Sequence, residues 1–148
     1  MFRPSRIVCL TEETVETLYL LGEQDRIVGI SGYVVRPPRA RCEKPRVSAF
    51  TSANIGEIVA LKPDLVLTFS DLQADIAADL IRRGLAVHAF NQRSVAGILD
   101  MIRMLGALVE ASERAEELVG ALEARLAEAR TRADNLNSHC SRRSPRRR

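Results

Sequence analysis

The stretch Asn54-Ile55-Gly56-Glu57-Ile58-Val59-Ala60-Leu61-Lys62-Pro63-Asp64-Leu65-Val66-Leu67-Thr68-Phe69 encodes a short helix, a helix stop and a strand. Its first half has apolar residues at helical spacing, so these should share one face: Ile55, Ile58, Val59 and Leu61. Pro63 lacks an amide hydrogen and drives Lys62 out of the α region, which ends the helix. The apolar run Leu65–Leu67 is typical of a strand covered by helices on both faces. Open α/β sheets place ligands beyond the carboxyl ends of such strands, where Phe69 stands.

Strand and helix patterns alternate along the rest of the chain. Further apolar runs typical of strands cover 6–10, 26–30, 46–48 and 85–90, and amphipathic patterns typical of helices cover 12–21, 71–83, 95–109 and 112–130. The face of the 71–83 helix that we expect to be buried contains Leu72, Ile76, Leu80 and Ile81. This alternation predicts right-handed βαβ units and a parallel sheet.

The predicted fold class is therefore α/β. We expect a Rossmann-like, three-layer lobe with a short, mainly parallel sheet over residues 1–110, followed by a long helix over 111–132. Residues 133–148 have no hydrophobic periodicity, and we predict a disordered basic tail there.

Charge is divided unevenly between the tail and the rest of the 148 residues. Residues 130–148 contain seven arginines and one aspartate, whereas residues 1–129 contain fifteen basic and eighteen acidic side chains. The predicted lobe is thus mildly acidic, which argues against a nucleic-acid-binding surface. The tail could touch nucleic acid or anionic lipid by charge alone, but we interpret it as the result of truncation or a frameshift.

Several classes of protein receive no support from the sequence. Cys9, Cys42 and Cys140 lack the spacing of metal ligands, so we predict neither a metal site nor a disulfide framework. No apolar run approaches the length of a membrane span. No segment resembling a signal peptide precedes the first strand, so we expect a soluble chain that stays where it is made.

Aromatic residues follow three of the predicted strands. Tyr33, Phe50 and Phe69 should gather at one edge of a parallel sheet, where aromatic faces suit a bulky, partly apolar ligand. The alternative is that Phe50 and Phe69 only plug the ends of the core. No catalytic constellation is visible, and the glycines lack the spacing of a dinucleotide-binding loop. We therefore expect a binding protein rather than an enzyme.

Several segments together carry the pattern of a known family. They are 6–10, 26–30, Pro37-Pro38-Arg39-Ala40, Pro45-Arg46-Val47, 54–67, 83–87, the 94–108 helix and the 116–118 region; the core Ala60-Leu61-Lys62-Pro63-Asp64-Leu65-Val66 is the most specific. Over residues 5–130 the chain resembles the N-terminal lobe of substrate-binding proteins of ABC importers for cobalamin and ferric siderophores. In that class two lobes are joined by one rigid helix. The resemblance is closest to the cobalamin-binding branch.

The resemblance implies a non-catalytic substrate-binding component of an ABC importer, without a cofactor of its own. It implies that Tyr33, Phe50 and Phe69 line the N-lobe half of the ligand cleft, where the family often has Trp in place of the two phenylalanines. Arg36, which stands where a tyrosine is frequent, and Ser70, the neighbour of Phe69, are included in the predicted ligand site.

A second implied contact is with the importer itself. Glu57 matches the N-lobe glutamate that meets arginines of the membrane permease, and the helix from Ser112 matches the helix that joins the two lobes. The resemblance implies periplasmic residence, whereas the lack of a visible signal peptide leaves a cytoplasmic location as the alternative.

Departures from the family pattern leave further alternatives open. The second lobe and its docking glutamate are missing, so we expect a fragment or disrupted gene product with weakened binding. Alternatively, the chain is an interaction module that forms a homodimer through the exposed faces of its last two helices. An enzyme of flavodoxin-like topology would need phosphate-binding glycines that the sequence does not contain.

Overall fold

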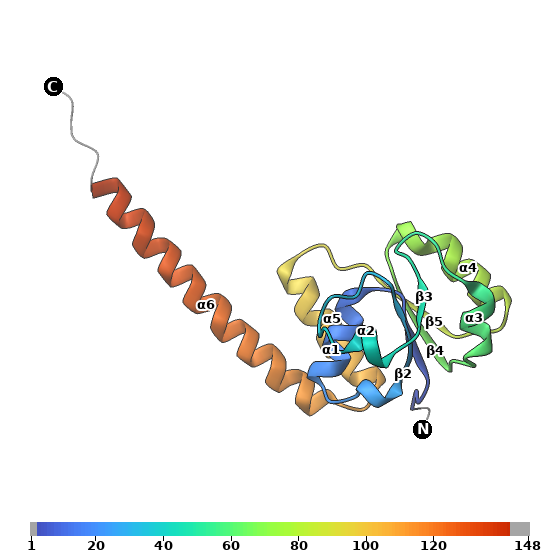
Figure 1. Ribbon diagram of the computed structural model, residues 1–148. Coiled ribbons are helices and arrows are strands. Elements are labelled where there is room, and N and C mark those ends of the chain that lie inside the picture. The colour runs from blue at the N-terminus through green and yellow to red at the C-terminus, as the bar shows by residue number, and fades with distance from the viewer. Residues whose placement is uncertain (1–2, 143–148) are drawn as a thin grey trace.

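The computed structural model describes residues 3–142 and has three layers, with a parallel sheet between two helical layers (Figure 1). The sheet contains five strands in the order β3-β2-β1-β4-β5. All neighbouring pairs are parallel. The strands are β1 (Ile7–Cys9), β2 (Ile27–Ser31), β3 (Arg46–Ser48), β4 (Leu65–Phe69) and β5 (Val87–Phe90). The α/β class, the layers and the parallel sheet predicted from the sequence are confirmed.

Helices cover both faces of this sheet. One layer contains α1 (Glu12–Leu20) and α5 (Val95–Leu108), and the other contains α3 (Ile55–Ala60) and α4 (Ala74–Arg82) (Figure 1). The loop between β2 and β3 includes the short helix α2 (Ala40–Glu43). The chain also has 3-10 turns η1 (Gln24–Arg26) and η2 (Asp71–Gln73), and ends in the long helix α6 (Ser112–Arg142).

Alternate residues of the central strands point into two separate cores. Ile7 and Cys9 of β1 pack in the core beneath α1 and α5, whereas Val8 packs in the core beneath α3 and α4. In β4, Leu67 packs in the core beneath α1 and α5, and Val66 packs in the core beneath α3 and α4. Because both faces of these strands are buried, they contain continuous apolar runs.

Residues 54–69, the stretch quoted first, fold largely as predicted. The Asn54 side chain caps α3 by accepting a hydrogen bond from the Glu57 amide at 3.1 Å. Lys62 leaves the right-handed helical region with φ of 48°, which ends the helix before Pro63. One expectation is wrong: Val59 is 36% exposed, because α3 is only six residues long and presents just one strip of side chains, centred on Ile58, to the sheet.

The segment before α4 also differs from the prediction. Asp71–Gln73 form a 3-10 turn, stabilised where the Ser70 hydroxyl accepts a hydrogen bond from the Leu72 amide at 3.3 Å. This turn is out of phase with α4, so Leu72 is 58% exposed. Ile81 is equally exposed, since the buried strip of α4 is narrow and consists of Ile76 and Leu80.

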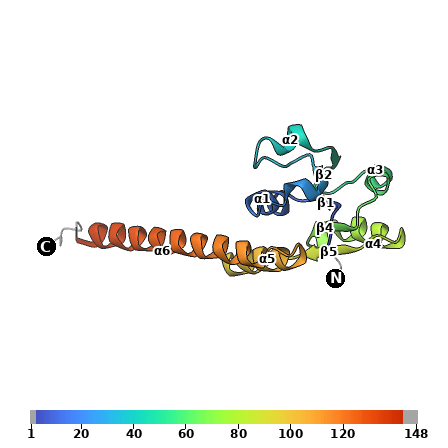
Figure 2. The same ribbon diagram turned by 90° about the horizontal axis from the view of Figure 1, so that it is seen from below.

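Helix α6 is longer than the sequence pattern suggested. It continues to Arg142, so the prediction of disorder is wrong for residues 133–142; residues 143–148 of the predicted tail lie outside the described part. The apolar period ends near Ala133, but no glycine or proline interrupts residues 121–142, so the helix started by the strong helix formers of 121–132 meets no stop signal. Residues 127–140 are all exposed, and the helix extends well beyond the lobe (Figure 2).

The first turns of α6 are held against α5 by close packing. Ala115 and Val119 are buried. A Cβ atom on Gly106 of α5 would lie only 2.4 Å from the Cβ atom of Ala115, so a side chain at Gly106 would force the two helices apart.

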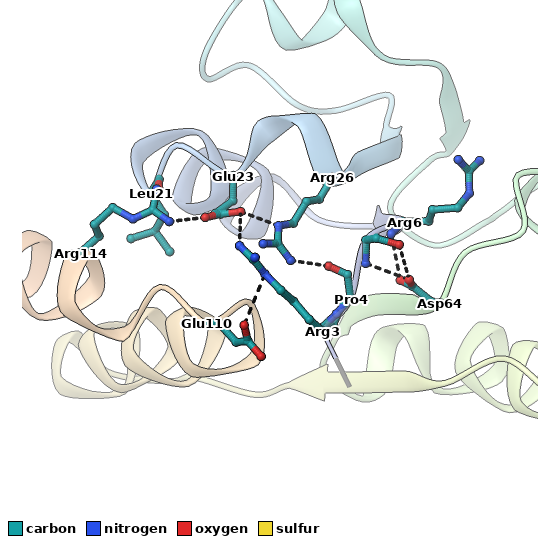
Figure 3. Close-up of polar contacts among 10 residues, drawn as sticks. Arg3, Pro4, Arg6, Leu21, Glu23, Arg26, Asp64, Glu110 and Arg114 are labelled. Atoms are coloured by element: carbon teal, nitrogen blue, oxygen red, sulfur yellow. Dashed lines mark hydrogen bonds and ion pairs between the residues drawn. The ribbon is translucent and has the colours of Figure 1, made fainter. Parts of the chain in front are cut away.

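Opposite the carboxyl ends of the strands, an ionic cluster ties α6 to the lobe (Figure 3). The buried carboxylate of Glu23 forms ion pairs with Arg26 and Arg114. Arg3 lies 3.9 Å from the same carboxylate and 3.6 Å from Glu110, in the turn between α5 and α6. Arg26 also donates to the Pro4 carbonyl at 2.6 Å. The cluster therefore joins the N-terminal segment, the start of β2 and the base of α6.

A second contact at this edge fixes the starts of β1 and β4. Partial burial opposes ionisation of Asp64, but its carboxylate accepts hydrogen bonds from the Ser5 amide, the Ser5 hydroxyl and the Arg6 amide at 2.8 to 2.9 Å. These bonds prevail and lower the pKa of Asp64 below its ordinary value of 3.8.

We predict that Glu23→Gln lowers the free energy of unfolding by about 2 kcal/mol. Breaking a buried ion pair typically costs about 3–5 kcal/mol, and we expect less here because Arg3 and Arg114 are half exposed. Urea unfolding measures the change. The control is Glu117→Gln, at an exposed glutamate of α6. Equal stability of the two variants would contradict this role for the cluster.

Candidate functional site

The predicted ligand-site residues lie at or beside the carboxyl edge of the sheet. Tyr33 follows β2, Phe50 follows β3, Phe69 ends β4, and Ser70 comes directly after it. Arg36 is exposed in the loop between β2 and α2. Because the strands are parallel, their carboxyl ends meet at one edge, which is where open α/β sheets bind ligands.

The aromatic side chains at this edge are exposed to different degrees. Tyr33 is 64% exposed. Phe69 is partly buried and packs against the core beneath α1 and α5, and Phe50 is also partly buried. Phe69 thus closes part of the core and still retains an accessible portion, and Phe50 also retains an accessible portion. Their contact with a ligand stays a prediction.

One buried side chain that the sequence analysis did not select organises the edge. The amide group of Gln73 donates to the Leu10 carbonyl at 3.0 Å and to the Phe50 carbonyl at 2.8 Å. Its oxygen accepts a hydrogen bond from the Phe69 amide at 2.9 Å. Gln73 is only 1% exposed, so these bonds form away from water. They hold the ends of β1 and β4 and the loop after β3 together.

Ser70 shapes the turn that carries Phe69. Its φ of 57° is in the left-handed region, and its amide donates to the Phe90 carbonyl at the end of β5, at 2.8 Å. The Ser70 hydroxyl is engaged with the Leu72 amide, and the residue is 8% exposed. Ser70 therefore shapes the loop through its backbone amide and its hydroxyl.

Arg93 covers part of the Phe69 ring. Its guanidinium carbon lies 5.6 Å from the ring centroid, within the range of a cation–π contact. Sequence analysis missed Arg93, since a single arginine in a loop gives no signal of its position in space.

Glu57 lies in the first turn of α3, which follows the loop that contains Phe50. It is exposed and borders a hollow of about 640 Å³ that is lined also by Arg46, Ser48, Ser52 and Asn54. An exposed carboxylate in this position is accessible to a protein partner, as its predicted role requires; the role itself stays a prediction.

Other kinds of site find little support in the described part of the chain. Among residues 3–142, no cluster of three or more His, Cys, Asp or Glu side chains has the arrangement of a metal site. None of the helices within this range combines the length and apolarity that crossing a bilayer requires. Burial raises the pKa of the Cys9 thiol to about 12, which keeps it unreactive.

The interaction-module alternative also stays a prediction. Its strongest support is a groove of about 500 Å³ between α5 and α6, lined by Val95, Ile98, Leu99, Leu122, Arg125 and Leu126. This groove adjoins the exposed part of α6, but the contacts of a single chain do not identify what covers it.

The fold is a three-layer α/β lobe with a five-stranded parallel sheet. The sequence pattern of the periplasmic binding protein family matches residues 7–141, and the chain belongs to this family. Within the family it matches the N-terminal lobe of cobalamin- and siderophore-type binding proteins.

Individual relatives agree with this assignment. The chain is 27% identical over 138 residues to an uncharacterised ABC transporter substrate-binding lipoprotein of Bacillus subtilis, YvrC, covering 90% of this chain and 43% of the relative. It is 37% identical over 68 residues to the vitamin B12-binding protein of Vibrio cholerae, covering 46% of this chain and 24% of the relative. The chain therefore spans less than half the length of either of these two relatives.

Solved structures share the fold. The periplasmic vitamin B12 binding protein BtuF of Vibrio cholerae superimposes with a TM-score of 0.78 at 26% identity, covering 89% of this chain and 52% of that protein. A periplasmic heme binding protein of Pseudomonas aeruginosa gives 0.81 at 20% identity, covering 95% and 50%. The match to the second protein concerns the fold alone.

We predict that Gln73→Leu destabilises the lobe by about 2–3 kcal/mol, because it leaves two carbonyls and one amide without partners. The Phe69 amide should also exchange its hydrogen much faster. Urea unfolding and hydrogen exchange measure these effects. Gln24→Leu is the matched control, since the Gln24 side-chain oxygen is buried without a hydrogen-bond partner. Unchanged protection of the Phe69 amide in Gln73→Leu would refute the role of Gln73.

Proposed function

We propose that this chain provides the N-terminal wall of the ligand cleft in a substrate-binding protein of an ABC importer. The proposed ligand is cobalamin or an iron chelate, and the role is capture without catalysis. The observation that carries the proposal is the aromatic carboxyl edge, held together by Gln73, in a member of the periplasmic binding protein family.

Relatives support both the transport system and the type of ligand. Named relatives include an ABC transporter substrate-binding lipoprotein and vitamin B12-binding proteins. The family assignment also supports a periplasmic location. Tyr33, Phe50 and Phe69 would contact a flat ligand with their accessible portions, while Arg36 offers a polar contact at the rim.

Equilibrium titration with cyanocobalamin and hemin tests this proposal. We expect weak binding of at least one of them, because one wall supplies about half of the contacts of a two-walled cleft, and each ~1.4 kcal/mol lost weakens affinity tenfold. Phe69→Ala should weaken that binding further by removing an aromatic contact.

Leu136→Ala is the control for this titration, since Leu136 is 72% exposed on α6, far along the helix from the lobe. An affinity that Phe69→Ala leaves unchanged would show that the ligand binds elsewhere on the chain. A complete lack of binding to both compounds at high micromolar concentrations would count against the proposed class of ligand.

The proposed partner is the importer's permease, which Glu57 would contact through an arginine. Glu57 is exposed in the first turn of α3, where a protein partner can reach its carboxylate. We predict that Glu57→Arg abolishes stimulation of ATP hydrolysis by the permease complex in proteoliposomes, whereas Glu117→Arg, on exposed α6, does not. Equal stimulation by both variants would exclude this contact.

A further inference from the structure

We propose that Arg93 is a ligand-contacting residue that makes the binding edge prefer ligands with a carboxylate beside a flat ring. This inference rests on the proposed function and narrows its ligand class. Arg93 follows β5, at the opposite end of the sheet from Phe50, and so extends the edge beyond the aromatic residues.

Three contacts hold the Arg93 side chain in place. Its guanidinium lies over the Phe69 ring. Its Nε donates to the Asn91 side-chain oxygen at 3.0 Å, and its Nη2 lies 3.3 Å from a carboxylate oxygen of Asp71. None of these bonds uses Nη1. The group is therefore oriented, yet its side chain is 63% exposed and retains donors for a ligand.

A hollow of about 600 Å³ lies beside Arg93 and gives the ligand somewhere to sit. Apolar Val95, Ile98 and Met101 line it together with Glu13, Gln92 and Ser94. Gln92 donates to Glu13 at 3.3 Å, while its own side-chain oxygen is buried without a hydrogen-bond partner. An apolar ring edge fits the apolar part of this lining.

The chemistry of arginine selects the anionic group. A guanidinium is planar, stacks on flat π systems and binds a carboxylate through paired N–H donors. Glu13 and Asp71 also lie at this site, and their negative charges repel a ligand carboxylate. A preference for a carboxylate must therefore come from Arg93. Removing the Asp71 charge should therefore strengthen carboxylate binding, whereas removing the Arg93 charge should weaken it.

The experiment uses two matched pairs of probes that differ in carboxylates. One pair is cyanocobalamin and its derivative with one amide arm hydrolysed to a carboxylate; the other is hemin and hemin dimethyl ester in the same low concentration of detergent. Equilibrium titrations at low ionic strength compare the wild-type chain with Arg93→Gln, Asp71→Asn and Arg82→Gln. Arg82 is the control because it is an arginine of α4 with a similar exposed acidic partner.

For the pair that the wild type binds, we expect the carboxylate form to bind at least about threefold more tightly, the scale of an exposed ion pair. Arg93→Gln should abolish this preference, Asp71→Asn should increase it, and Arg82→Gln should leave it unchanged. Binding of both members of a pair with equal affinity, or a preference that survives Arg93→Gln, overturns the inference alone. Failure of the wild type to bind all four probes overturns the proposed function along with it.

Discussion

At the carboxyl edge of the sheet, the Gln73 amide forms hydrogen bonds with the backbone of three separate segments. Strands β2 and β1 lie between β3 and β4, so β3 and β4 are about 14 Å apart. The loop after β3 must therefore cross the edge for Phe50 to reach Gln73. A buried amide compensates for the lost hydration of these backbone groups only while all partners are in place. The relative position of Phe50 and Phe69 depends on this condition.

Polar interactions of two kinds stabilise opposite ends of the strands. At the amino edge, Glu23 collects arginine side chains from the N-terminal segment, the start of β2 and the base of α6. At the carboxyl edge the neutral amide of Gln73 joins three backbone segments, and Arg93, paired with Asp71, lies over Phe69. This separation allows α6 to be anchored rigidly at its base without burying the edge to which we assign ligand binding.

Much of the fold could be predicted because its local signals agree with one another. Pro63 and the apolar run from Leu65 mark a helix stop and a buried strand, and both appear where expected, while the cap formed by Asn54 was found only in the structure. Errors occurred where periodicity was the only guide. Leu72 is exposed because a 3-10 turn changes the phase, and α6 continues to Arg142 because no glycine or proline stops it, although residues 127–140 are exposed.

The chain by itself determined the class of fold, the order of its elements and the placement of Tyr33, Phe50 and Phe69 after strands, since these follow from hydrophobic period and local stops. Only the tertiary structure decided that Gln73 joins the loops and that Arg93 lies over Phe69. These contacts join residues that are 23 and 24 positions apart in the sequence. They arise because parallel strands bring distant loops to the same edge, and local patterns contain no record of such neighbours.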